Sequence, residues 1–130
     1  MLKWHASNLS RNFMTQKTYT IDAKGMTIGR VAAEAAKALM GKTFADYTPH
    51  IPSQVQVTVT NAGKIRTTEK KRLQKTYTRY SGHPGGIKIE SLGSLMGAKG
   101  KGAAVRKAVE RMLPRNTMKV GRLKRLSITE

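Results

Sequence analysis

The sequence contains no cysteine, few aromatic residues and few acidic residues. Without cysteine the chain forms neither a disulfide nor a thiolate metal site. Its histidines, His5, His50 and His83, are far apart, and only 7 residues are acidic, so we expect no bound metal and no cofactor. No apolar run approaches the roughly 18 residues of a membrane-spanning helix, so we expect no membrane partner.

Positive charge is the most prominent property of the sequence. Lys and Arg number 25, which gives a formal net charge of +18. The charge is uneven, since the chain has 7 basic and 3 acidic residues up to Ala62, and 18 basic and 4 acidic residues after it. A soluble small domain typically carries a net charge of about 2 to 8. The excess indicates a polyanionic partner, and nucleic acid comes before an anionic membrane.

The motifs of nucleotide-binding and catalytic sites are incomplete in this sequence. Gly97 to Lys101 has the wrong spacing for a phosphate-binding P-loop, and no hydroxyl residue follows. The glycines after His83 lack the dinucleotide-binding pattern. His83 has Ser81 beside it, but no carboxylate close in sequence to orient it. We therefore expect no enzymatic activity and no small-molecule substrate.

The first part of the chain predicts a strand, a helix and a second strand. Thr18 to Asp22 reads as a strand followed by a turn at Lys24-Gly25. A helix is expected to begin near Thr27 and to end at Gly41, because apolar residues recur at intervals of three and four. The proline-containing segment 44–53 reads as a loop, and valines alternate with polar residues from 55 to 60. This order predicts two parallel strands joined by a crossover, and therefore an α/β fold.

The second part of the chain is more basic and less regular. Residues 70–72 are expected to form a basic turn, and residues 75–80 a strand. Residues 87–96 fit either a strand or a helix, and residues 97–102 read as a flexible cationic loop. Val105, Ala108, Val109 and Met112 share one face of a predicted helix over 103–113, which Pro114 ends. The residues from 118 onward read as a basic C-terminal tail.

The stretch YSGHPGGIKIE, residues 80 to 90, is interpreted as a turn that faces a nucleic acid. Its glycines allow the backbone to approach phosphate closely. Arg79 and Lys88 flank it with charge, and the rings of Tyr77 and Tyr80 suit stacking on bases. His83 is expected to be a contact and not a catalyst.

Three blocks of residues together resemble a known family. The first combines Asp22-Ala23-Lys24-Gly25 with Tyr47-Thr48-Pro49-His50, the second combines Asn61-Ala62-Gly63-Lys64 with the loop 81–88, and the third begins at Met112-Leu113-Pro114 and continues through 121–126. In this order and spacing, over about residues 17 to 128, the chain resembles the bacterial-type ribosomal protein thirteen family of the large subunit.

The resemblance implies a three-layer α/β/α domain around a small, mostly parallel four-stranded sheet. Residues 17–130 would form this single domain, and residues 1–16 a basic N-terminal arm. The arm reads either as an organellar presequence or as a tail that becomes ordered on RNA, and Met14 is an alternative start. The location would accordingly be the bacterial cytoplasmic ribosome or an organellar ribosome.

The resemblance also implies a non-catalytic role in binding large-subunit ribosomal RNA, in early assembly, and in contact with neighbouring ribosomal proteins. Composition alone equally permits a general nucleic-acid chaperone or a DNA-compacting protein. The expected RNA-contacting residues combine basic, aromatic, histidine and loop glycine positions. They are Lys42, Tyr47, His50, Lys70, Lys71, Arg72, Lys75, Tyr77, Arg79, Tyr80, Gly82, His83, Gly85, Gly86, Lys88, Arg106, Lys107, Arg111, Arg115, Lys119, Arg122, Lys124 and Arg125.

Overall fold

A computed structural model describes residues 17–130, and the predicted N-terminal arm lies outside this range. The described chain is a mixed α/β structure, as predicted, with two separate sheets. The strands are β1 (Thr18–Asp22), β2 (Gln56–Thr60), β3 (Thr76–Tyr80), β4 (Ile87–Ser91) and β5 (Leu126–Ile128). The helices are α1 (Ile28–Leu39), the short 3₁₀ helix η1 (Ala62–Lys64), α2 (Glu69–Gln74), α3 (Leu92–Met112) and α4 (Met118–Lys124).

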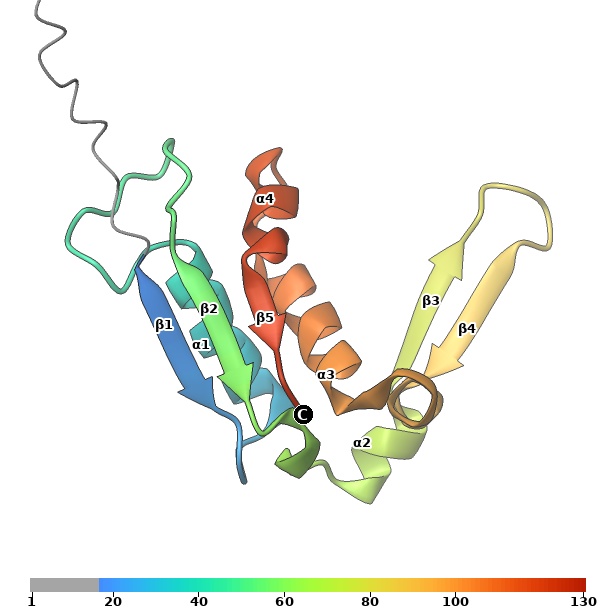
Figure 1. The fold of residues 1–130 in the computed structure, drawn as a ribbon. Helices are drawn as coiled ribbons and strands as arrows, with labels where there is room; N and C mark the ends of the chain where they lie inside the picture. The colour runs from blue at the N-terminus through green and yellow to red at the C-terminus, as the bar shows by residue number, and fades with distance from the viewer. Residues whose placement is uncertain (1–16) are drawn as a thin grey trace, which may run out of the picture.

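The main sheet has three parallel strands in the order β1-β2-β5. Figure 1 shows α1 and α3 together behind this sheet. Tyr19, Ile21, Val57 and Val59 point toward the helices, whereas the alternate residues of β1 and β2 are threonine, aspartate and glutamine on the open face. Among residues 17–130 the main sheet is therefore covered by helices on one face only, and it has three strands where we expected four strands and a third layer.

Helix α1 matches its prediction closely. Thr27 is the N-cap, and the predicted apolar stripe, which includes Val31, Ala35 and Leu39, is buried. Gly41 follows the C-cap with a positive φ of 84°, the left-handed conformation that commonly ends a helix. The small alanine side chains let α1 lie close to the sheet and to α3, which is how a core with few aromatic residues is filled.

Strands β3 and β4 form a separate antiparallel hairpin, which projects from the rest of the molecule in Figure 1. The segment 87–96, which fitted either a strand or a helix, contains both: β4 ends at Ser91, whose side chain accepts a hydrogen bond from the Ser94 N–H at the start of α3. Only Gly100, with φ 78° and ψ 169°, interrupts the helical backbone, so the predicted loop over 97–102 is in fact a kinked helix.

The expectation of a basic C-terminal tail is wrong for the described residues. Residues 118–124 form α4, and β5 pairs in parallel with β2 through Val57 and Leu126. The Glu130 carboxylate accepts a hydrogen bond of 3.1 Å from the Gly102 N–H, just after the kink in α3. The last residues thus complete the main sheet and tie it to α3.

Two smaller expectations also differ from the structure. Residues 70–72 belong to helix α2 and not to a turn, because Thr68 supplies the N-cap and Glu69 the acidic first-turn residue. Met112 is exposed at the end of α3, although Val105 and Val109 on the same predicted face are fully buried.

Within residues 17–130, no helix has the length and apolar character that crossing a membrane requires.

We predict that Gly41→Ala destabilises the chain more than Gly25→Ala. Both glycines have positive φ, but a Cβ on Gly25 meets no atom within 4 Å, whereas a Cβ on Gly41 would lie 2.8 Å from the Ser53 Cβ. Ser53 is held there, because its Oγ donates a 2.7 Å hydrogen bond to the Leu39 carbonyl. We expect Gly25→Ala to cost about 1 kcal/mol and Gly41→Ala about 2 to 4 kcal/mol in urea unfolding. Equal costs would contradict this packing.

Candidate nucleic-acid interface

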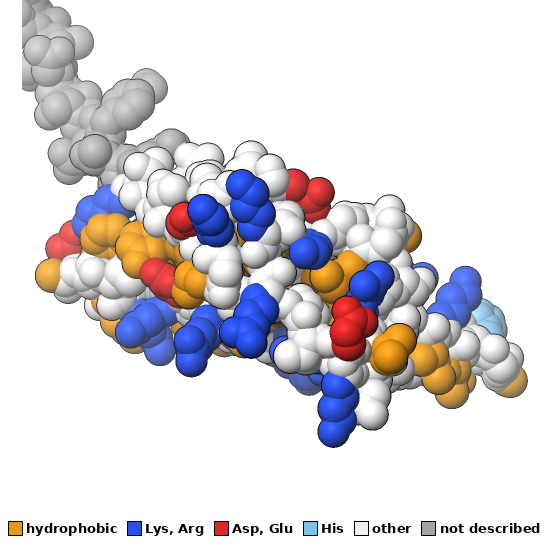
Figure 2. Space-filling view, turned by 90° about the horizontal axis from the view of Figure 1, so that it is seen from below, with side chains coloured by type: hydrophobic (Ala, Val, Ile, Leu, Met, Phe, Trp, Pro, Cys, Tyr) orange, Lys and Arg blue, Asp and Glu red, His pale blue; other side chains and the backbone are white. Residues whose placement is uncertain are grey.

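The acidic side chains are already engaged within the chain. Asp46, Glu69, Glu90 and Glu110 form ion pairs with Lys17, Arg72, Lys107 and Lys119, respectively. Glu34 accepts a hydrogen bond from the Tyr19 hydroxyl, Asp22 from the Asn61 side chain, and Glu130 from the Gly102 N–H. Most of the cations therefore have no carboxylate to pair with, and Figure 2 shows many blue and few red side chains on the face seen from below.

Hydrogen bonds shift the pKa of three side chains in the first part of the described chain. The hydrogen bond from Asn61 holds the pKa of the Asp22 carboxyl below its usual value, and the bond from Lys17 does the same for Asp46. The bond to Glu34 raises the pKa of the Tyr19 hydroxyl. Residues 17–130 contain no cluster of three or more side chains suited to holding a metal ion.

Helix α2 presents a compact group of cations. Lys70, Lys71, Arg72 and the following Lys75 are all exposed, and the ion pair between Arg72 and Glu69 is long, at 3.9 Å. Because an α-helix has about 3.6 residues per turn, the three consecutive basic residues point in different directions around its axis. The group can therefore contact phosphates that approach from more than one side.

The glycine-rich loop 81–86 is the exposed tip of the hairpin. Gly82 and Gly85 have positive φ values of 92° and 75°. The Gly86 N–H donates to the His83 carbonyl at 3.0 Å, and the Ser81 N–H donates to the Gly86 carbonyl at 3.2 Å. A Cβ on Gly86 would lie 2.0 Å from the Ser81 Oγ and 3.0 Å from the His83 carbonyl oxygen, so any larger residue there would displace the Ser81 side chain and press on the turn. The turn that we predicted is present, and its His83 side chain is exposed.

The structure corrects the role expected for Tyr77. The residue is only 9% exposed and belongs to the hydrophobic core. Lys107 Nζ and the Arg111 guanidinium lie 4.7 Å and 4.8 Å from its ring centroid, and Lys75 Nζ lies 5.9 Å away. Lys107 also pairs with Glu90 at 3.0 Å. The ring is therefore enclosed by Lys75, which directly precedes β3, and by two cations of α3, so it anchors the hairpin instead of offering a free face to a base.

Tyr80 differs from Tyr77 in both exposure and direction. It is 58% exposed, and its cross-strand partner is Ile87. The cations Arg79 and Lys88 face each other across the hairpin one position earlier, and successive residues of a strand point to opposite faces. Tyr80 therefore lies on one face of the hairpin, and Arg79 lies with Tyr77 on the other face. The rings and the guanidinium group that we expected to alternate along one surface are on two surfaces.

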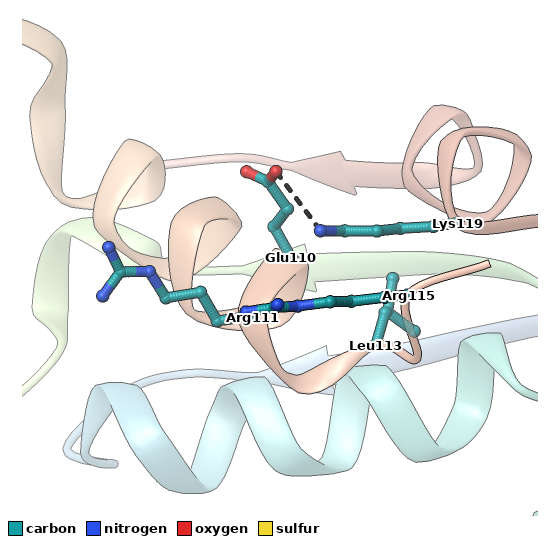
Figure 3. A pocket seen from close by; sticks show the side chains of 5 residues that line it. All are labelled: Glu110, Arg111, Leu113, Arg115 and Lys119. Carbon is teal, nitrogen blue, oxygen red and sulfur yellow. Dashed lines mark ion pairs between the residues drawn. The ribbon is translucent and has the colours of Figure 1, made fainter. Parts of the chain in front are cut away.

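A second cationic group lines a hollow of about 350 Å³ where α3 ends and α4 begins. Its walls are Glu110, Arg111, Leu113, Arg115 and Lys119. Figure 3 shows the Arg115 and Lys119 side chains extending toward Glu110, and Lys119 Nζ lies 3.5 Å from the Glu110 carboxylate. Three cations around one carboxylate leave a net positive hollow that suits an anion such as phosphate.

The structure also corrects the role expected for Arg122. It is 4% exposed, and its Nε and Nη1 atoms are buried without a hydrogen-bond partner among the described residues. A surface phosphate cannot reach these two atoms in this arrangement. Arg125 is half-buried, and its Nη1 donates to the Ser53 carbonyl, so one of its donors is already used.

The other predicted residues fall into three groups in space. Lys42, Tyr47 and His50 are exposed in the loop between α1 and β2, which Figure 1 places far from the hairpin tip, and Lys42 Nζ lies 5.9 Å from the Tyr47 ring centroid. The hairpin group is Lys70, Lys71, Arg72, Lys75, Arg79, Tyr80, Gly82, His83, Gly85, Gly86 and Lys88. The α3–α4 group is Arg106, Lys107, Arg111, Arg115, Lys119 and Lys124.

Several cations outside the predicted set also belong to the positive surface. Lys64, Arg66 and Lys99 are exposed around η1 and the first part of α3. In the sequence, only their positive charge suggested a place on this surface. Charge alone does not distinguish them from lysines that are used in hydrogen bonds within the chain. Lys101 is such a case, because its Nζ donates to the carbonyls of Gly63 and Ile65 at 2.8 Å and 3.3 Å.

We predict that the two hairpin tyrosines differ in their contribution to stability. Tyr77→Thr should lower the free energy of unfolding by about 3 kcal/mol, because it removes a buried ring and exposes a cavity. Tyr80→Thr keeps strand propensity and removes an exposed ring, so we expect a change within about 0.5 kcal/mol. Chemical denaturation of both variants checks this, and similar losses would contradict the assignment of Tyr77 as the anchor.

Comparisons with known proteins identify a family for this chain. Residues 16–130 match the family model described as ribosomal protein L13. The chain is 44% identical over 110 residues to the large ribosomal subunit protein uL13 of Nitrosococcus oceani, which covers 85% of this chain and 77% of the relative. It is 41% identical over 118 residues to the uL13 protein of Pelotomaculum thermopropionicum, covering 91% and 81%.

A third relative, the uL13 protein of Chlorobium phaeobacteroides, is 42% identical over 113 residues, which is 87% of this chain and 75% of the relative. These relatives are named as proteins of the large ribosomal subunit, in agreement with the expectation of a non-enzymatic protein. Since both the family model and the relatives cover most of the sequence, the chain belongs to the ribosomal protein L13 family.

Proposed function

We propose that the chain is a structural constituent of the large ribosomal subunit, which binds large-subunit ribosomal RNA and supports early assembly of the subunit. The observation that carries this proposal is the surplus of exposed cations on α2, the hairpin and the α3–α4 end, in a chain whose carboxylates already have partners. Residues 17–130 would act as one ribosomal-protein domain.

Electrostatics supplies the main part of the binding free energy in this proposal. Each phosphate that a lysine or arginine neutralises releases counterions, which favours binding most strongly at low salt. About ten such contacts give a log-log slope of affinity against salt concentration of roughly −7 to −9. Binding that is independent of salt would overturn the electrostatic mechanism.

The separation of the cationic groups suggests how one small protein would organise RNA. Figure 1 places the hairpin tip far from the loop that carries Lys42, and the hollow lies where α3 ends and α4 begins. Because a rigid core fixes their distances, RNA segments bound to each group would be held in a defined arrangement. Selectivity would come from the shape of the RNA and from its single-stranded elements, because the major groove of duplex RNA is too narrow for side chains to read.

The tip of the hairpin would make a close backbone contact. Loop 81–86 has no large side chain apart from His83 and Pro84, and the exposed Gly82 and Gly85 allow its backbone to approach a phosphate closely. Successive N–H groups in such turns form concave sites for anions. Arg79 and Lys88 beside the loop would add charge at the same phosphate backbone.

The competing hypothesis is a general nucleic-acid chaperone or a DNA-compacting protein. Competition at matched salt separates the two functions. We expect large-subunit ribosomal RNA to displace bulk DNA from the chain, and equal preference would favour the competing function.

The proposed location is the ribosome of the bacterial cytoplasm, and an organellar ribosome is the alternative if residues 1–16 are a presequence. Mass spectrometry of the N-terminus in purified ribosomes distinguishes the two.

We predict that Lys70→Gln combined with Lys71→Gln weakens binding to large-subunit ribosomal RNA and reduces the salt slope by roughly 1.4 to 1.8. Both lysines are exposed on α2, and neither forms an ion pair with a described residue. Filter binding or fluorescence anisotropy across a series of salt concentrations measures the effect.

The matched control is Arg30→Gln combined with Lys37→Gln, which removes the same charge from exposed positions of α1. We expect this control to retain nearly the original slope, because its cations lie outside the three groups. If both double variants lose the same slope, the binding depends on net charge alone and the proposed interface is wrong.

A further inference from the structure

The two faces of the β3–β4 hairpin have opposite chemical character. Cross-strand pairing puts Arg79 opposite Lys88 and Tyr77 opposite Glu90 on one face. The same register puts Thr78 opposite Ile89 and Tyr80 opposite Ile87 on the other face. We call Thr78, Tyr80, Ile87 and Ile89 the open hairpin face. It contains no charged residue, although the chain carries a net charge of +18.

The charged face of the hairpin is the one that packs on the protein. Tyr77 lies among Lys107 and Arg111 of α3, and Glu90 pairs with Lys107. The open hairpin face points away from these contacts. The exposed fractions of Tyr80, Ile87 and Ile89 are 58%, 60% and 67%. An apolar strip is therefore exposed to solvent beside a highly charged surface.

This arrangement is unfavourable unless another surface covers it. A two-stranded hairpin is marginally stable on its own, and here only one of its faces is supported. Exposed clusters of large apolar side chains are typical of interaction sites. Leu73, which α2 contributes next to the hairpin, is also strongly exposed, and Figure 2 shows hydrophobic side chains gathered at this end of the molecule.

We propose that the open hairpin face is a docking surface for an apolar segment of a neighbouring large-subunit ribosomal protein. The inference rests on the proposed function, since it assumes that the chain is part of the large subunit. The placement of charged side chains on only one face of the hairpin indicates which class of partner the other face binds. A surface made for phosphate would place cations toward it, whereas here the two cations of the hairpin strands, Arg79 and Lys88, point to the opposite face.

The geometry fits strand or helix docking by a protein. The strip of Tyr80, Ile87 and Ile89 presents β-branched and aromatic side chains, which pack well against another apolar surface. The hairpin has no third strand among the described residues, so its outer strand edges also have backbone groups available for pairing. The hairpin would then contact RNA at its tip and through Arg79 and Lys88, and protein on its open face.

Site-specific photocrosslinking in intact large subunits tests this proposal. Ile89→p-benzoylphenylalanine places the probe on the open hairpin face, and Lys88→p-benzoylphenylalanine places it one residue away on the charged face as a matched control. We expect the probe at 89 to crosslink one large-subunit protein, identified by mass spectrometry, and the probe at 88 to crosslink RNA. Crosslinking of the probe at 89 only to RNA, only to a second copy of this chain, or to nothing would overturn the proposal.

A second variant tests the apolar nature of the contact. With the probe moved to Tyr80, Ile87→Thr combined with Ile89→Thr keeps strand propensity and removes apolar area. We expect the yield of the protein crosslink to fall about tenfold, which is the effect of about 1.4 kcal/mol of lost burial. An unchanged yield would contradict an apolar interface.

Binding of the isolated double variant to purified large-subunit ribosomal RNA should stay within about twofold of the original chain, because no cation is removed. This measurement separates the two proposals. Loss of the crosslink with intact RNA binding supports the docking surface, and absence of RNA binding by the original chain would refute the proposed function itself.

Discussion

Uncompensated positive charge is the constraint on which the rest of the structure depends. The chain carries 25 basic and 7 acidic residues, and each acid is engaged by an ion pair or a hydrogen bond within the chain. The remaining cations repel one another at the surface of a small core made largely of alanine, valine and leucine. Binding to a polyanion would relieve this repulsion, which is the physical basis of the proposed function.

The architecture divides the chain into a supporting part and a projecting part. Strands β1, β2 and β5 with helices α1 and α3 hold the apolar side chains, and β5 brings the C-terminal residues back to the centre of the molecule. The hairpin and α2 extend from this support and contribute only Tyr77 to the core. The cations around the Tyr77 ring both anchor the hairpin and continue the positive surface, so one cluster serves packing and charge together.

Local patterns predicted the first part of the fold well. The spacing of Val31, Ala35 and Leu39 and the alternation of Val57 and Val59 are set by neighbours in sequence, so α1, β1 and β2 could be predicted. The third strand was missed because β5 has only three residues and pairs with β2 across a long stretch of chain. The burial of Tyr77 and Arg122 depends on tertiary packing, and no local pattern distinguishes them from the exposed Tyr80 and Lys124. The charged groups of the site were predictable as a set, but their division into separate surfaces was not.

The most direct test of the central claim is a lysine footprint by acylation and mass spectrometry, with the free chain compared with the chain in intact large subunits. We expect Lys70, Lys71, Lys75 and Lys88 to lose most of their reactivity in the subunit, whereas Lys24 and Lys37, which are also exposed but lie outside the three cationic groups, should stay reactive. Equal protection of both sets, or full reactivity of the hairpin lysines, would contradict it.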